Sequence, residues 1–158
     1  MIIDYKFNDK SYLYELFEKC IIKNKNACNF LKSYDIIIPV PLHRKKKLQR
    51  GYNQCELIAK EIIKYLNNNQ CNILLETKAL KKIKNTKPQS LKNLNERKLS
   101  VIDSYYVDDK SKILSKNILL FDDIYTTGST CMECKKMLLQ AGAKNVGIFC
   151  IAKDLFLI

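Results

Sequence analysis

The chain of 158 residues is 47% hydrophobic and 28% charged, which excludes a disordered polymer and provides for one core, so we predict a single domain over residues 1–158. Its 28 Lys and Arg residues outnumber its 16 Asp and Glu residues, and the formal net charge of +12 favours an anionic partner larger than a metabolite, with nucleic acid as the natural candidate. No run reaches the roughly 18 apolar residues that cross a bilayer, and the start lacks a basic-then-apolar signal pattern, so we expect a cytoplasmic protein without membrane insertion.

The first predicted elements are helices, followed by a strand. Apolar residues recur at helical spacing over 13–21 and 27–31, which predicts two helices in an N-terminal segment, 1–34. Ile36 to Ile38 form the apolar run of a buried strand, which Pro39 ends. After a basic stretch that we interpret as a loop, the apolar stripe from Cys55 to Leu66 predicts a further helix.

The second half of the chain alternates between strands and other segments. We interpret 77–100, which is rich in lysine and interrupted by Pro88, as a loop of the kind that forms lids. Gly142 is placed to cap a helix that begins near Ser129. Short apolar runs predict four strands, at 73–75, 102–107, 117–121 and 146–152. This order predicts an α/β fold, a parallel sheet flanked by helices, with the core at 35–154.

One segment, 118–130, carries most of the chemical information. Its apolar run ends in Asp122 and Asp123, at the carboxyl end of a strand where open α/β sheets place ligands. Carboxylates only accept hydrogen bonds, so they suit vicinal hydroxyls or a hydrated Mg²⁺. The loop that follows offers backbone N–H groups and hydroxyls to a phosphate at the start of a helix, from Thr126, Thr127, Gly128, Ser129 and Thr130. The implied ligand is a sugar diol beside a monophosphate.

This segment resembles the phosphoribosyl pyrophosphate (PRPP) motif of type I phosphoribosyltransferases. The resemblance implies a parallel sheet with a small hood, formed here by the helical segment 1–34. It implies that Asp122 and Asp123 are the catalytic acids that hold the ribose hydroxyls, that 126–130 bind the 5′-phosphate, and that Mg²⁺ enters with PRPP near the two acids. It also implies that Lys87 and Gln89 belong to a flexible loop that closes over the ligand.

Two further motifs, Pro39 to Arg44 and Gln49 to Gln54, resemble the signature of ComF-type proteins, which are phosphoribosyltransferase-like components of DNA uptake and competence. The resemblance assigns the pyrophosphate loop to Pro41, Leu42, His43 and Arg44. Such proteins commonly begin with a zinc ribbon of paired cysteines, and we expect that module to be missing or on another polypeptide. ComF-type proteins also have an Arg that is followed three residues later by an Asn. In this chain Arg97 is present, but Ser100 stands where the Asn would be.

Basic residues are concentrated in two clusters that we expect near the ligand-binding edge. The ComF resemblance and the high positive charge together imply single-stranded DNA as the partner, and basic residues bind backbone phosphates without reading sequence. The candidates are Arg44, Lys45, Lys46, Lys47, Arg50, Lys81 and Lys82. Tyr52, Tyr105 and Tyr106 are candidates for base stacking or for ordinary core positions.

The seven cysteines have irregular spacings and do not predict a disulfide scaffold. Cys131 and Cys134 share one helix face with Leu138 and Ala141, which favours packing in the core over a metal site.

Three functions remain open from the sequence. The first is a PRPP-binding accessory protein of natural transformation, with competence proteins as possible partners. The second is a phosphoribosyltransferase of purine or pyrimidine salvage, and the third is a regulator that senses PRPP without turnover. The acceptor base has no recognisable pocket signature, so the sequence leaves catalysis open, and a homodimer is compatible with all three.

Overall fold

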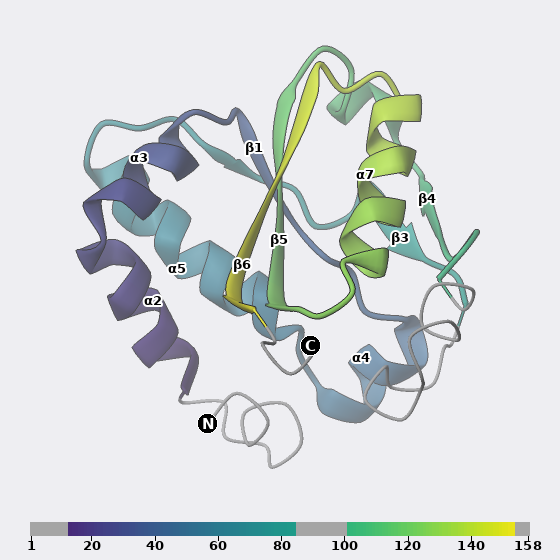
Figure 1. Ribbon diagram of the computed structural model, residues 1–158, viewed down its shortest axis with the longest axis horizontal. Helices are drawn as coiled ribbons and strands as arrows, with labels where there is room; N and C mark the ends of the chain where they lie inside the picture. Colours follow the sequence, from purple (N-terminus) through teal and green to yellow (C-terminus); the bar gives the residue numbers. More distant parts are fainter. Residues whose placement is uncertain (1–12, 85–100, 154–158) are drawn as a thin grey trace.

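The computed structural model describes residues 13–84 and 101–153 (Figure 1). Helices and strands follow one another in the order α2 (Leu13–Lys23), α3 (Lys25–Lys32), β1 (Ile36–Pro39), α4 (Arg44–Arg50), α5 (Gln54–Asn68), β2 (Leu74–Leu75), β3 (Leu80–Lys82), β4 (Tyr105–Val107), the short 3-10 helix η2 (Lys110–Lys112), β5 (Asn117–Tyr125), α7 (Ser129–Gln140) and β6 (Asn145–Lys153). Among the helices in these ranges, none has the length and apolar character needed to cross a membrane.

The main sheet has the strand order β2-β1-β5-β6, and all of its neighbours run parallel. Ile36 pairs with Ile118 and Pro39 with Phe121, so β1 and β5 end at the same edge. Parallel neighbours require crossover connections, which α5 and α7 supply. The predicted fold, a parallel sheet flanked by helices, is confirmed.

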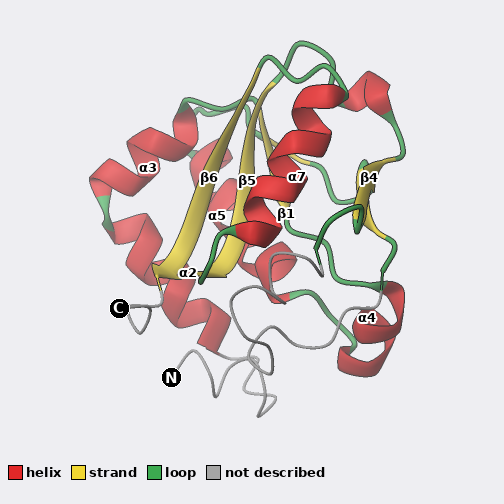
Figure 2. Ribbon diagram, turned by 45° about the vertical axis from the view of Figure 1, so that its right-hand side comes forward, coloured by secondary structure: helices red, strands yellow, loops and turns green. Residues whose placement is uncertain are grey.

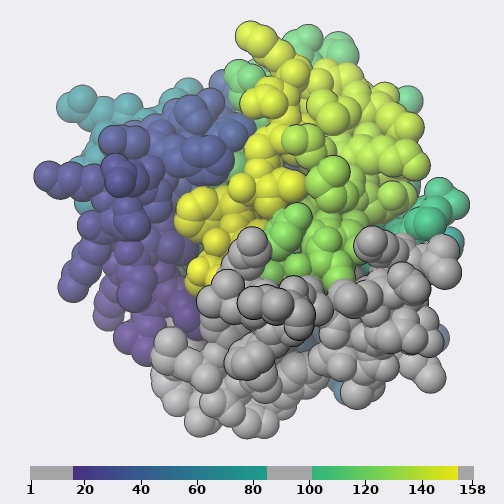
Figure 3. Space-filling view, in the orientation of Figure 1, coloured from purple at the N-terminus to yellow at the C-terminus, as the bar shows by residue number. Residues whose placement is uncertain are grey.

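Helices α2, α3 and α5 lie on one face of the sheet, and α7 lies on the other with the β3-β4 ribbon (Figure 2). Edge strand β6 is partly exposed in a band between the N-terminal helices and α7 (Figure 3). On the α5 face, Phe121 stacks on Phe149 with ring centroids 5.6 Å apart. The predicted helical stripe is confirmed because its side chains are buried there, at Cys55, Ile58, Ala59, Ile62, Ile63 and Leu66.

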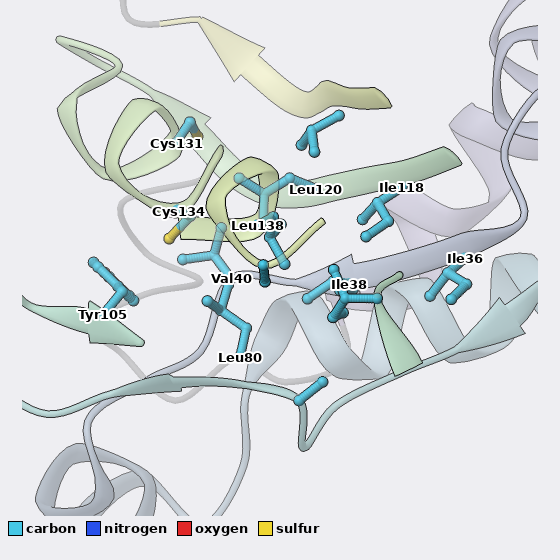
Figure 4. Close-up of a cluster of buried hydrophobic side chains, with 14 of the residues drawn as sticks. Ile36, Ile38, Val40, Leu80, Tyr105, Ile118, Leu120, Cys131, Cys134 and Leu138 are labelled. Atoms are coloured by element: carbon cyan, nitrogen blue, oxygen red, sulfur yellow. The ribbon is translucent and has the colours of Figure 1, made fainter. Parts of the chain in front are cut away.

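The α7 face has a second core, in which side chains of α7 meet those of β1 and β5 (Figure 4). Cys131, Cys134 and Leu138 are buried there together with Ala141, as their spacing predicted. The seven cysteines are free thiols, in agreement with the expectation of no disulfide scaffold.

Two predictions about loops were wrong. The basic stretch after β1 is a helix, α4, because its Lys, Arg, Leu and Gln residues are strong helix formers and Gly51 ends it in a left-handed conformation, φ 82°. The polar stretch from 77 contains β3, which pairs antiparallel with β4 because Leu80 can bury its side chain while Lys81 remains exposed.

Strand boundaries also differ from the predicted ones. β4 begins at Tyr105 instead of 102, after a turn, and β5 continues through Asp122 and Asp123 to Tyr125. Residues 85–100, with Lys87, Gln89, Arg97 and Ser100, lie outside the described residues, as do residues 1–12 of the predicted hood.

Candidate functional site

The two acids lie where β5 reaches the carboxyl edge of the sheet. Asp123 is buried, and its Oδ1 accepts a hydrogen bond from the Ile124 N–H at 2.8 Å. Asp122 is half-buried and accepts from the Asp123 N–H at 2.9 Å through Oδ1. These local bonds orient both carboxylates before any ligand is present.

Two thiols also contact Asp122, one from each face of the sheet. Cys131 Sγ on α7 donates to Oδ2 at 3.4 Å, and Cys55 Sγ on α5 lies 3.8 Å from Oδ1. The pKa of Cys131 is raised by its hydrogen bond with Cys150, by burial and by the negative charge of Asp122. Cys131 therefore stays a neutral thiol near neutral pH and can donate to the carboxylate.

The predicted phosphate loop connects β5 to α7 beside the acids. Thr127 Oγ1 lies 2.7 Å from Ser129 Oγ and also accepts from the Ser129 N–H at 3.3 Å. Gly128 precedes the first residue of α7 with φ 72°, and a Cβ there would collide with the Tyr125 ring. The loop thus presents its hydroxyl groups at a helix N-terminus, where an anion is favoured.

The loop after β1 is fastened to both neighbouring elements. The Val40 N–H donates to the Phe121 carbonyl at 2.8 Å, which fixes the loop to β5. Asn53 Nδ2 donates to the Val40 carbonyl at 3.0 Å, and Asn53 Oδ1 accepts from the Cys55 N–H at 3.1 Å. The same loop continues into α4, where His43 Nδ1 accepts from the Lys45 N–H.

A cavity of about 480 Å³ opens between this loop, α4 and β3. Its lining combines apolar and cationic side chains; the lining residues are Pro39, Pro41, Leu42, Arg44, Lys47, Leu48, Gly51, Asn53, Glu56, Thr77, Leu80, Lys81 and Lys82. The cavity therefore brings together members of the two basic clusters that are more than 30 positions apart in the sequence.

Not every predicted residue takes part in this cavity. Lys45, Lys46 and Arg50 belong to α4, but they and His43 are not among its lining residues. The acid pair lies outside the lining as well.

Tyr105 cannot stack on bases, because its side chain is only 2% exposed and packs in the α7-face core. Burial and the nearby Cys134 and Asp122 raise the pKa of Tyr105. Lys82 Nζ lies 5.1 Å from the centre of the Tyr105 ring. Of the three tyrosines, Tyr106 is exposed and Tyr52 is half-buried, and stacking by these two stays a prediction.

Asn53, Cys55 and Thr77 were not among the candidate site residues predicted from the sequence, although Cys55 was predicted in the helical stripe and Asn53 lies in a ComF-like motif. An Asn directly before an apolar helical stripe is a cap signal that points to Asn53. The approach of Cys55 to Asp122 has no such local signal, because 67 positions separate the two residues.

Together, the parallel sheet, the acids at its carboxyl edge and the hydroxyl-rich loop define a phosphoribosyltransferase-like α/β protein. Solved structures similar to the chain include a purine phosphoribosyltransferase from Pyrococcus horikoshii, at 19% identity and TM-score 0.45 over 81% of this chain and 68% of that one. A glutamine PRPP amidotransferase from B. subtilis is similar at 18% identity and TM-score 0.45, over 78% of this chain and 25% of that one.

Curated proteins similar to this chain are named for competence or for DNA utilization. Competence protein ComFC of Streptococcus pneumoniae is 32% identical over 94% of this chain and 60% of its own length. Competence protein F of Haemophilus influenzae is 26% identical over 84% of this chain and 56% of its own length. DNA utilization protein YhgH of Escherichia coli K12 is 26% identical over 77% of this chain and 50% of its own length. The predicted ComF-type resemblance is confirmed by these homologues.

The chain spans about half to three fifths of the length of these relatives. No family model matches it.

Proposed function

We propose that the chain binds PRPP at the carboxyl edge of its sheet and acts in DNA uptake and natural transformation. In this proposal single-stranded DNA is held on a basic face, which consists of Arg44, Lys47, Lys81 and Lys82 around one cavity. One observation carries the proposal: the oriented acids at the end of β5 adjoin a hydroxyl-rich loop at the start of α7. Relatives named for competence and for DNA utilization support the cellular role.

Each part of PRPP has a matching group in this arrangement. The carboxylates of Asp122 and Asp123 accept hydrogen bonds from vicinal ribose hydroxyls, and 126–130 surround the 5′-phosphate. The loop after β1 then faces the pyrophosphate, with Arg44 as its cation. The two carboxylates offer oxygen ligands of the kind Mg²⁺ prefers, and Mg²⁺ bound with PRPP neutralises charge on the pyrophosphate.

Calorimetry with Mg-PRPP tests the first half of the proposal. Replacing both acids, Asp122→Asn with Asp123→Asn, keeps their shape but removes two negative charges, so we expect binding heat to disappear. Glu61→Gln is the control, since this carboxylate lies on the outer side of α5 and pairs only weakly with Lys64, at 3.7 Å. Unchanged affinity in the double variant would contradict PRPP binding by the acids.

The same samples distinguish the alternative functions. Release of pyrophosphate that requires an added purine or pyrimidine would assign the chain to nucleobase salvage. Tight Mg-PRPP binding without turnover, accompanied by a changed affinity for DNA or protein, would indicate a PRPP sensor.

The basic face is the basis for the second half of the proposal. Arg44, Lys47, Lys81 and Lys82 line one cavity, although their positions in the sequence are distant. Lys47 forms an ion pair with Glu56 at 2.9 Å, and Lys81 pairs with Asp108, so both side chains are partly ordered while about half exposed. Cations held on one surface attract a chain of phosphates and release its counterions.

Fluorescence anisotropy of a labelled single-stranded oligonucleotide, titrated at several salt concentrations, tests this half. The triple change Lys47→Gln, Lys81→Gln and Lys82→Gln should weaken binding and reduce the salt slope by about 2, since each phosphate contact in a single strand contributes about 0.7. The matched control replaces three exposed lysines on the N-terminal side, Lys25, Lys32 and Lys64, by Gln and removes the same charge. Equal weakening in both variants would show that net charge alone, and not this face, binds the strand.

A further inference from the structure

Two thiol groups, from Cys55 and Cys131, lie beside the acid pair. Cys55 Sγ and carboxylate oxygens of Asp122 and Asp123 all lie within 4.8 Å of one another, and they come from two different elements, α5 and β5. Cys131 approaches the second oxygen of Asp122 from α7 at 3.4 Å. Sugar binding gives no reason for a thiol at this position.

One of the distances between these atoms is close to the edge of a tetrahedral coordination shell, and the others are no longer than 4.8 Å. Zinc lies about 2.3 Å from a thiolate and about 2.1 Å from a carboxylate oxygen, so two such ligands at the tetrahedral angle are about 3.6 Å apart. Cys55 Sγ and Asp122 Oδ1 are 3.8 Å apart without any ion. A small adjustment of the thiol therefore suffices to complete this edge of a coordination tetrahedron.

Burial and charge also favour a cation here. Cys55 and Asp123 are 5% and 6% exposed and Asp122 is half-buried, so the negative charge of the carboxylates lies partly away from water, where a cation stabilises it. Oxygen ligands alone would suit Mg²⁺, but a thiolate ligand selects a softer metal ion.

We propose that Cys55, Asp122 and Asp123 form a binding site for a thiophilic divalent cation of the zinc class. Cys131 is a positioning residue that holds the second oxygen of Asp122, and the fourth coordination position is left to water. On binding, the Cys55 thiol gives its proton to solvent as the sulfur–metal bond forms.

The site has a consequence for the proposed PRPP function, and this consequence alone rests on that function. On that function, the ribose hydroxyls and the Mg²⁺ that accompanies PRPP both use oxygens of these two carboxylates. A cation ligated directly by Cys55, Asp122 and Asp123 occupies those oxygens and therefore competes with PRPP for the chain.

Cd²⁺ is a suitable probe because its charge-transfer absorption with thiolate reports sulfur ligation directly. The background protein carries Cys20→Ser and Cys71→Ser, which remove the more accessible thiols on the N-terminal helical side. We expect one Cd²⁺ per chain with a thiolate band. Loss of a group that merely supports a metal ligand typically costs 10- to 100-fold in affinity, so Cys55→Ser and, separately, Asp123→Asn should each cost at least about tenfold.

Matched controls remove the same chemical groups elsewhere. Cys28→Ser replaces a buried thiol that donates to backbone carbonyls of α2, and Glu61→Gln replaces a carboxylate on α5; both should bind Cd²⁺ as the background does. Because Asp123→Asn leaves Cys55 in place and preserves shape, a folding failure of the Cys55 variant does not decide the outcome. Retention of the band and affinity in Asp123→Asn, or in a folded Cys55→Ser variant, would overturn the site.

Titration of Mg-PRPP against the Cd²⁺-loaded chain separates the two proposals. Displacement of Cd²⁺ in proportion to PRPP supports both. Cd²⁺ binding with no PRPP binding by the free chain would contradict the proposed function alone, whereas PRPP binding with no Cd²⁺ affinity would overturn this inference alone.

Discussion

Asp122 is held by groups from three elements of the fold. A backbone amide of β5 donates to one of its oxygens, and thiols from α5 and α7 lie against both. Donors on both oxygens hold the carboxylate in one orientation. At the level of single residues, the site is therefore preorganised, and Gly128 determines the shape of the loop beside it.

Gly128→Ala should disturb the phosphate loop more than an ordinary loop substitution. Its positive φ alone costs a non-glycine residue about 1–2 kcal/mol, and the added methyl group must also displace the Tyr125 ring. We expect lower stability in urea unfolding and weaker Mg-PRPP binding in calorimetry.

Gly51→Ala provides the comparison, because Gly51 has φ 82° but nothing lies within 4 Å of the position that an added methyl group would take. Gly51→Ala should lose only the stability that a non-glycine residue loses at positive φ, about 1–2 kcal/mol. If both variants lost the same stability and PRPP affinity did not change in Gly128→Ala, the role of the Tyr125 contact would be refuted.

Glu76 connects the turn after β2 to η2. Burial would raise the pKa of Glu76, but its ion pair with Lys112 at 2.9 Å and the N–H groups of Lys78 and Ala79 together hold that pKa below its ordinary value. A lowered pKa in the folded state means that ionised Glu76 stabilises the fold above its unfolded pKa, about 4.3. This contribution is lost as the pH falls through the lower folded pKa.

Glu76→Gln should therefore reduce the free energy of unfolding by about 1 kcal/mol at neutral pH. The difference from the unmodified chain should shrink as the pH falls below about 4. Urea unfolding across this range measures it, with Glu61→Gln as the control whose exposed partner gives little stabilisation. A difference that stayed constant down to low pH would mean that the charge of Glu76 contributes nothing.

Among the elements, α5 both fills the core and positions the site. Its fully buried Ile58, Ile62 and Leu66 each contribute about 1.5–3 kcal/mol through removal of apolar surface from water. Its first turn presents Cys55 to Asp122, and its cap residue Asn53 also holds the Val40 carbonyl. The start of this helix and the loop after β1 are therefore tied together by one side chain.

Asn53→Ala should cost about 2–3 kcal/mol of stability. Loss of the helix cap accounts for about 1 kcal/mol, and the buried Val40 carbonyl, left without its partner, accounts for the remainder. Asn24→Ala is the control: Asn24 caps α3 from an exposed position, so only the cap contribution should be lost. Thermal and urea unfolding measure both, and equal costs would show that the bond to Val40 is unimportant.

For the whole molecule, the dominant feature is a net charge of +12 over 158 residues. Like charges at this density repel one another in the compact state and less so in the expanded one. The ion pairs Lys47–Glu56, Lys64–Glu61, Lys81–Asp108 and Lys112–Glu76 are between partly exposed side chains, so they offset little of this repulsion.

The melting temperature should therefore rise between low salt and about 0.5 M sodium chloride, because the Debye length falls well below 10 Å over that range. Differential scanning calorimetry measures the rise, which should be smaller in the variant that lacks Lys47, Lys81 and Lys82. A melting temperature that fell with added chloride would show that ion pairing outweighs repulsion in this fold.

The sequence determined those features that depend on neighbouring residues. The apolar runs of β1, β5 and β6, the stripe of α5 and the contiguous acids and hydroxyls of 122–130 were all predictable, since period and composition decide which side chains are buried. Helix α4 was missed, although its residues favour a helix, because a run of cations was interpreted as a solvated loop.

Tertiary structure alone decided which distant residues meet. Cys55 reaches Asp122 across 67 positions because β1 and β5 end at one edge of the sheet and the crossover helix α5 begins there. Lys81 joins Lys47 at one cavity because β3 lies beside α4 and the loop after β1. The antiparallel pairing of β3 with β4 was likewise invisible, since three residues have too little pattern to predict a strand. Local chemistry is encoded in local sequence, whereas the assembly of a site from separate segments depends on long-range packing that no short pattern specifies.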